Sequence, residues 1–250
     1  IVNDGKALTV TGTVNTDILT MGSSTGTDTN AVTFKNTTTI ASLDTSTGSS
    51  NNATNTITFD TSDQAFTATI VAIVDDADTD DTNGIVIDSG SIAAEGSANK
   101  LTYASAIVTG DAIDTITIGS ATTAGNALFS SGIVISGALT IDGGDTADEA
   151  STVEFQGAVT ATAILLDKNT ADSTMTVNAT NGAVTVAGTI DGVTAGDGIL
   201  AVIDDDADGA PNVVTFSGAI GASQNVGQLN VGNTTQAGNA LFTNATPVEV

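Results

Sequence analysis

Two aspartate-rich turns are the segments whose residue types and spacing are best suited to chemistry. The segments VAIVDDAD (71–78) and LAVIDDDAD (200–208) are similar, and a glycine follows each within a few residues. Alternate carboxylates in one turn can converge on a hard cation, and the glycine permits the sharp bend. We therefore predict that two clusters bind Ca²⁺ or another divalent cation: Asp76, Asp78 and Asp80, and Asp204, Asp206 and Asp208.

Two observations limit this interpretation. An EF-hand loop beginning at Asp204 would carry glutamate at its twelfth position, but that position holds Thr215, so the cluster is not an EF-hand. Acidic turns also form without any ligand, because Asp and Gly favour turns. A third acidic stretch is a weaker candidate for the same chemistry: Asp142, Asp145, Asp148 and Glu149.

The absence of several residue types excludes most other chemistry. The 250 residues include 29 Asp and Glu, four Lys, no Arg, no His and no Cys, for a net charge of −25. Without His or Cys there is no His-assisted serine nucleophile and no cysteine nucleophile. We therefore expect no enzyme; a polysaccharide-active enzyme using two carboxylates is the alternative. Nucleic acid is an unsuitable partner, because it is bound mainly through Lys and Arg.

Short β-strands are the elements that would position these turns. Period-2 alternation of apolar residues, flanked by Gly, Asn, Asp, Ser or Thr, recurs along the chain and predicts strands. We expect six of these apolar side chains to point inward: Val32, Phe34, Val153, Phe155, Val214 and Phe216. The continuous apolar run at 70–74 predicts a strand buried on both faces. No apolar run approaches the roughly 20 residues of a membrane-spanning helix, so we expect no membrane insertion.

Internal repeats define the predicted architecture. AGNALF occurs at 124–129 and again at 237–242, and the match extends so that 100–129 aligns with 213–242. Such units are too short to fold alone and must stack on their neighbours. We therefore predict an all-β fold, a right-handed parallel β-solenoid, forming one elongated repeat-built domain over residues 1–250. Tandem β-sandwich domains are the alternative.

Two stretches carry a resemblance to a known class of protein. VVTFSGAIGASQNVGQLNVGNTTQAGNALF (213–242) and TVEFQGAVTATAILL (152–166) resemble the β-strand-repeat proteins of bacterial surfaces, in particular rickettsial-type autotransporter passengers and surface-layer proteins. The resemblance covers about the last 150 residues well and the first 100 loosely. It implies a β-rich rod that is exported and displayed outside the cell.

These observations together predict a structural, extracellular surface protein that assembles into a surface layer, sheath or filament. The unit LTVTGTV (8–14) is related to the unit IVISGAL (133–139) that follows the first AGNALF, and nothing similar follows the second. We therefore expect copies of the chain to join head to tail. The chain begins at Ile1, which suggests excision from a precursor, and a segment of a longer rod is the alternative. An adhesin rod that binds a host or neighbouring cell is the alternative function.

Overall fold

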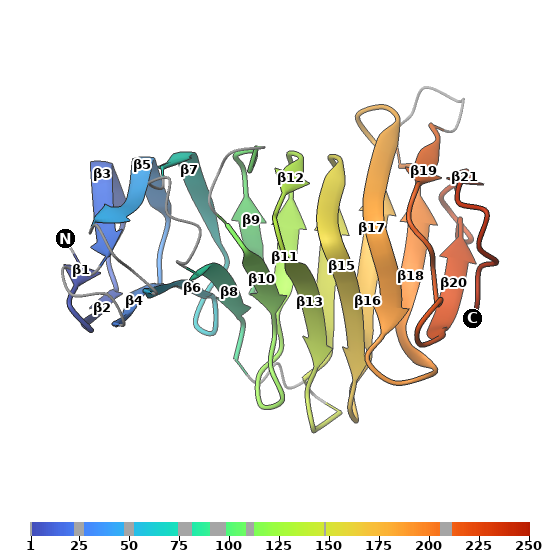
Figure 1. The fold of residues 1–250 in the computed structure, drawn as a ribbon, viewed down its shortest axis with the longest axis horizontal. Helices are drawn as coiled ribbons and strands as arrows, with labels where there is room; N and C mark the ends of the chain where they lie inside the picture. The colour runs from blue at the N-terminus through green and yellow to red at the C-terminus, as the bar shows by residue number, and fades with distance from the viewer. Residues whose placement is uncertain are drawn as a thin grey trace.

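The structure is a computed structural model that describes residues 2–22, 28–47, 53–74, 82–90, 99–108, 113–147, 149–205 and 212–250. Within these ranges every regular element is a β-strand, so none of them contains a helix that could cross a membrane. Figure 1 shows the strands stacked side by side along one long axis, with the two termini at opposite ends. The chain therefore forms one stack of coils, called the rod below, whose axis runs from the N-terminus to the C-terminus.

Successive strands alternate between two sheets. The first sheet contains, in order, β1 (Val2–Asn3), β3 (Val14–Gly22), β5 (Thr38–Thr47), β7 (Phe66–Val74), β9 (Leu101–Tyr103), β11 (Asn126–Phe129), β14 (Ser151–Phe155), β16 (Ser173–Asn178), β18 (Asp197–Ile203) and β20 (Val226–Val231). The second contains β2 (Ala7–Val10), β4 (Thr29–Phe34), β6 (Thr54–Asp60), β8 (Thr82–Asp88), β10 (Thr115–Ile118), β13 (Ala138–Gly143), β15 (Val159–Lys168), β17 (Val184–Gly192), β19 (Val214–Phe216) and β21 (Ala240–Phe242). A short strand, β12 (Ile133–Val134), pairs with β15.

This topology is a parallel β-solenoid. Every pairing between the strands named above is parallel, and each strand inside the stack, apart from the short β12, pairs with the strand one coil before it and the strand one coil after it. A β-sandwich of the immunoglobulin kind is built from antiparallel sheets. The prediction of a parallel β-solenoid is thus confirmed, and the sandwich alternative is wrong.

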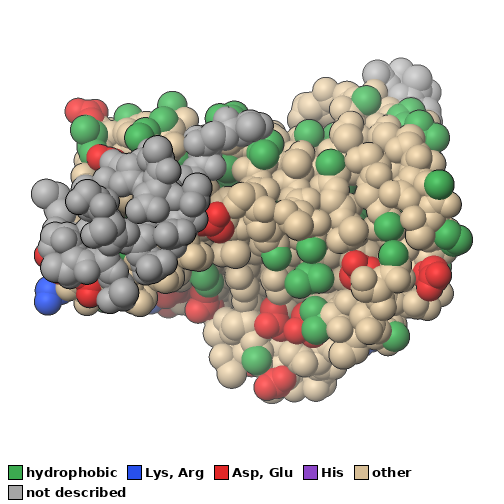
Figure 2. Space-filling view, viewed as in Figure 1, with side chains coloured by type: hydrophobic (Ala, Val, Ile, Leu, Met, Phe, Trp, Pro, Cys, Tyr) green, Lys and Arg blue, Asp and Glu red, His purple; other side chains and the backbone are tan. Residues whose placement is uncertain are grey.

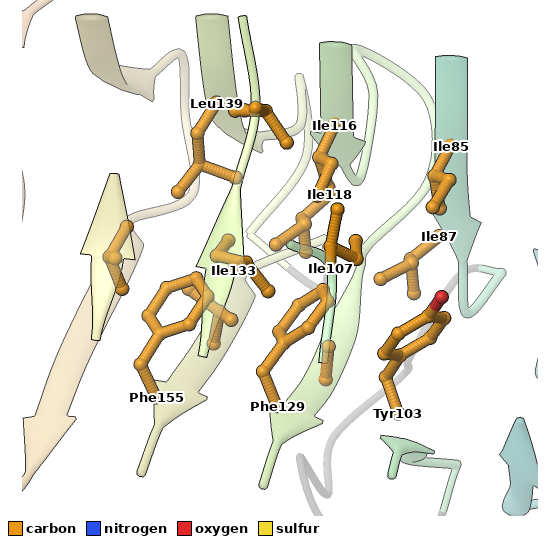
Figure 3. Close-up of a cluster of buried hydrophobic side chains, with 14 of the residues drawn as sticks. Ile85, Ile87, Tyr103, Ile107, Ile116, Ile118, Phe129, Ile133, Leu139 and Phe155 are labelled. Carbon is orange, nitrogen blue, oxygen red and sulfur yellow. The ribbon is translucent and has the colours of Figure 1, made fainter. Parts of the chain in front are cut away.

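The core lies between the two sheets and contains a column of aromatic rings. All six side chains predicted to point inward are buried, with at most 2% of their surface exposed. Figure 3 shows Phe155, Phe129 and Tyr103 side by side, facing Ile133 and Ile107 across the core. The ring centroid of Phe129 lies 5.5 Å from that of Tyr103 and 5.1 Å from that of Phe155. The few aromatic residues are therefore concentrated where coils stack.

The apolar run at 70–74 is not buried on both faces. Ile70 and Ile73 point into the core, but Val71 is 65% exposed and Val74 is 46% exposed. Strand β7 thus has one buried face, and the prediction for this segment is wrong. A run of apolar residues does not indicate by itself which of its side chains face water, and here the outer face of the sheet is open.

A second column, made of asparagine amides, crosses the core near the start of three strands. Asn30, Asn55 and Asn83 occupy equivalent positions in β4, β6 and β8 and are almost fully buried. The Asn30 amide donates to Asn55 Oδ1 at 3.0 Å, and the Asn55 amide donates to Asn83 Oδ1 at 2.9 Å. Because a buried amide without partners is costly, this ladder fixes the register of neighbouring coils.

The internal repeat recurs as a three-strand unit, but in opposite sheets. Strands β9, β10 and β11 correspond to β19, β20 and β21, and each pair of equivalent strands lies in different sheets. Both copies contain a turn that begins at a glycine with positive φ, at Gly119 (80°) and Gly232 (73°). The backbone N–H of each glycine donates to the preceding coil, to Ile87 O (2.9 Å) and Val202 O (2.8 Å). The sequence repeat therefore encodes the same local structure twice.

Candidate functional site

Of the six predicted metal ligands, the structure describes Asp204. This residue follows β18, is buried, and its backbone N–H donates to Ala237 O at 2.8 Å. Its carboxylate accepts a hydrogen bond from the backbone N–H of Asn212. The other five predicted ligands lie outside the described residues: Asp76, Asp78, Asp80, Asp206 and Asp208. Calcium binding by the two clusters therefore stays a prediction.

Several other acidic side chains act as acceptors for turn backbone. Glu149 Oε2 accepts the N–H of Thr146 at 2.9 Å, and Asp197 Oδ2 accepts the N–H of Thr194 at 2.6 Å. Both carboxylates belong to buried residues. Hydrogen bonds from backbone N–H groups satisfy such carboxylates without a cation. Some acidic residues of this chain therefore stabilise the turns that connect the two sheets.

Several carboxylates on neighbouring coils lie close enough to repel one another. Asp142 in β13 and Asp167 in β15 are in register on neighbouring strands. Burial raises the pKa of Asp142 above its ordinary value, and repulsion from Asp167 and Asp145 raises it further. Burial likewise raises the pKa of Asp167, together with repulsion from Asp197 and Asp145. Within the described ranges, no group of three or more His, Cys, Asp or Glu side chains is arranged to hold a metal ion.

This repulsion predicts a stabilising substitution, Asp167→Asn. The pKa of Asp167 is higher in the folded than in the unfolded chain, so its charged form opposes folding at about pH 7. The effect is absent below the unfolded pKa of about 3.9, grows as the pH rises from there to the folded pKa, and is fully present above the folded pKa. We expect the variant to melt at a higher temperature than the parent at about pH 7 and at the same temperature at about pH 3, as measured by circular dichroism.

The matched control is Asp172→Asn. Asp172 lies in the same region, but its carboxylate forms a 2.6 Å ion pair with Lys168, so its removal should not raise the melting temperature. A lower melting temperature for Asp167→Asn at both pH values would contradict the repulsion described above. It would mean that the Asp167 carboxylate is a needed acceptor.

A shallow groove crosses the outer face of the first sheet, near the carboxyl ends of three strands. Its volume is about 490 Å³. Ala201 and Ile203 of β18 line it in the middle, Thr176 of β16 and Asn230 of β20 line its two sides, and the turn at 232–234 closes one end. Thr176, Ala201 and Asn230 are in register on adjacent strands. Asp204 follows Ile203 directly, so the groove adjoins one predicted metal turn.

Outer-face side chains near the groove form a polar network. Glu154 of β14 is in register with Thr176. Its carboxylate accepts a hydrogen bond from the Asn178 amide at 2.9 Å and lies 3.6 Å from Lys100 Nζ. The negative charge of Glu154 is thus balanced by one of the few lysines. On the face shown in Figure 2, acidic groups (red) and hydrophobic side chains (green) are interspersed among other side chains and backbone (tan).

Sequence patterns did not indicate this groove. Its residues come from three coils, and none of them is a predicted catalytic or metal-ligating residue. The one available signal is the repeated turn, which predicts a structured loop at 232–238 but no ligand. Comparison of the chain with protein-family models, with curated proteins and with solved structures gave no match. The geometry described above is therefore the basis for any functional conclusion.

Proposed function

We propose that this chain is a structural rod of a cell surface, and that copies of it assemble end to end into a filament, sheath or surface layer. The observation that carries the proposal is the pair of parallel sheets that run the length of the rod. In the described part of the chain, β1 and β2 are the edge strands at one end, and β20 and β21 are the edge strands at the other. Open strand edges are templates for pairing with another chain.

Apolar side chains at the two ends support the same proposal. Val10 and Val14 at one end, and Leu229 and Phe242 at the other, pack on the core but remain partly exposed. Stacking two ends would extend both sheets and would cover these side chains, as adjacent coils do within the rod. The free energy of association would then come from the same contacts that stabilise the solenoid.

The surface chemistry supports an extracellular, non-enzymatic role. A net charge of −25 favours solubility and attraction of cations, and it disfavours nucleic acid and anionic lipid. Calcium held by the turns at 76–80 and 204–208 is part of this proposal, because a cation there would offset the acidic charge. The resemblance to bacterial surface repeat proteins points to the same location.

The substitution Thr9→Pro tests end-to-end assembly. Ala31 N donates to Lys6 O and Lys35 N donates to Val10 O, both at 3.0 Å, so Lys6 and Val10 face β4. Successive backbone groups of a strand alternate sides, which directs Thr9 toward the open edge. Proline there removes an N–H from the edge and leaves the β2–β4 ladder intact. We expect filaments of the parent chain to disappear, with little change in melting temperature.

Electron microscopy and sedimentation velocity in calcium and salt provide the measurement. Thr9→Val is the control, because it keeps the edge N–H and should still assemble. Filaments that persist in Thr9→Pro would show that β2 does not form the joint. A parent chain that stays a monodisperse monomer at high concentration would rule out the assembly proposal altogether.

An adhesin rod is the second candidate function. The observation that favours it is the groove on the first sheet, whose volume of about 490 Å³ lies within the range of about 300–1,000 Å³ typical of ligand pockets. A monomeric rod that binds cells would support this candidate over the first. The two functions are compatible, because the groove lies on a sheet face and the proposed joints lie at the ends of the rod.

A further inference from the structure

We propose that the groove formed by β16, β18 and β20 binds a neutral oligosaccharide. The inference concerns binding by a sheet face and does not depend on end-to-end assembly. A rod that never polymerises could bind the sugar, and a polymerising rod could fail to bind it.

The groove offers polar groups that have spare hydrogen-bonding capacity. The hydroxyls of Thr176 and Thr234 form no hydrogen bond with any described residue. Asn230 Oδ1 accepts the Gln228 amide at 2.8 Å, which leaves the Asn230 amide nitrogen as a donor toward the groove. Hydroxyls both donate and accept, and an amide nitrogen donates twice. This set matches the hydroxyl groups of a sugar, each of which also donates and accepts.

The turn that closes the groove is held in one conformation. Asn233 Oδ1 accepts the backbone N–H groups of Thr235 and Gln236, both at 2.8 Å, and the Asn233 amide donates to Gln236 Oε1 at 2.6 Å. Gly232 begins the turn with φ 73° and donates its N–H to Val202 O. A preformed turn loses little conformational entropy on binding, so the wall that carries Thr234 is ready for a ligand.

Charge selects a neutral ligand. None of the described side chains that line the groove is ionisable, although the chain carries 29 acidic residues. The nearest acidic side chain in the same register row, Glu154, is paired with Lys100. An anionic sugar would be repelled by the net charge of −25 without gaining an ion pair in the groove.

The floor of the groove supplies apolar contact. Ala201 and Ile203 are partly exposed on the outer face of β18, between the polar side chains of the flanking strands. The C–H groups of a pyranose ring can pack on such a surface while its hydroxyls reach Thr176 and Asn230. Because the groove is open and has no aromatic platform among its described residues, we expect a dissociation constant of about 1 mM. An assembly of many chains, each with one such groove, would bind a multivalent sugar more tightly through avidity.

The repeat provides an internal comparison. The first copy of the repeated turn, at 119–125, adjoins strands β6, β8 and β10, as the turn at 232–238 adjoins β16, β18 and β20. Asp88, at the end of β8, stands where the groove has Ile203 at the end of β18. A carboxylate there removes the apolar floor and adds charge, so this surface should not bind the same ligand.

The experiment uses saturation-transfer NMR on the full chain with four probes. Cellotetraose, mannotetraose and tetra-N-acetylchitotetraose are neutral, and tri-galacturonate is the charged comparison. We expect at least one neutral probe to give a signal, and tri-galacturonate to give none.

Three variants test whether the groove is the binding site. Ala201→Phe fills the groove at a position where strands accept aromatic residues, and it should abolish the signal. Asn230→Leu should weaken binding about tenfold by removing one hydrogen-bonding group. Thr102→Val, on the outer face of the same sheet but away from the groove, should change nothing.

Four results would overturn the proposal. They are no signal from any neutral probe at about 10 mM, an equal signal from tri-galacturonate, an unchanged signal in a folded Ala201→Phe variant, or self-association of the parent chain that Ala201→Phe abolishes. The last result would make the groove an interface between copies of the chain. If Ala201→Phe fails to fold, as judged by circular dichroism, Asn230→Leu alone decides: undiminished binding rejects the site.

Discussion

Replacing Phe129 with alanine is expected to lower the free energy of unfolding by about 3–5 kcal/mol, as for other buried Phe truncations. Phe129 is fully buried in the middle of the aromatic column, between Tyr103 and Phe155. The substitution removes its ring contacts with both neighbours and leaves a cavity that the flanking coils can fill only in part. Because three coils share these contacts, the loss should be felt beyond β11.

Urea denaturation followed by far-ultraviolet circular dichroism measures this effect. Leu241→Ala is the control, since Leu241 is half exposed on β21 and should change stability by less than about 0.5–1 kcal/mol. Phe129→Leu should fall between the two, because it keeps part of the buried volume. A loss below about 1 kcal/mol for Phe129→Ala would mean that Phe129 does not pack inside the rod and that the register of β11 is wrong.

Replacing Gly188 with alanine is expected to lower the free energy of unfolding about as much as Phe129→Ala does, because of the backbone conformation at Gly188. Gly188 lies in β17 with φ 115°, a conformation that residues with a side chain rarely adopt. An added Cβ would also lie 2.1 Å from the carbonyl oxygen of Ala161 on the neighbouring strand, where the β15–β17 register shifts. Backbone strain of roughly 1–3 kcal/mol and steric overlap of a similar size should combine.

The sequence supplies a matched control for this substitution. Gly12 is the fifth residue of LTVTGTV (8–14), as Gly188 is of the similar unit VTVAGTI (184–190). No atom lies within 4 Å of the position of a Cβ added to Gly12. Gly12→Ala should therefore leave the melting temperature nearly unchanged, whereas Gly188→Ala should lower it by several degrees. Equal melting temperatures for the two variants would contradict the close approach of β15 and β17.

Much of the fold could be predicted from alternation of apolar residues. The strands around Val32, Val153 and Val214 follow a strict period of two, so their inward faces could be read directly. Strand β5 could not be predicted in this way. Its buried residues Ile40 and Leu43 are three positions apart, because the strand turns two consecutive side chains outward between them. Such a bend breaks the period on which the prediction depends.

The groove depends on register between coils, which the sequence does not display. Thr176, Ala201 and Asn230 become neighbours only because the corners between strands have particular lengths. Coil length varies along the rod, as the asparagine ladder shows with separations of 25 and 28 residues. No fixed period therefore identifies the residues that meet on an outer face. The predicted metal clusters are not compared with the structure in this way, because five of their six residues lie outside the described ranges.

The position of the internal repeat has a consequence for valency. The second AGNALF begins 113 residues after the first, and its strand lies in the opposite sheet. Each coil contributes one strand to each sheet, so the two copies are separated by a half-integer number of coils. A separation by a whole number of coils would place both copies on the same side of the rod. A partner that recognised only the features shared by the two turns would meet them on opposite flanks of the rod. One rod could then crosslink two such partners without any second chain.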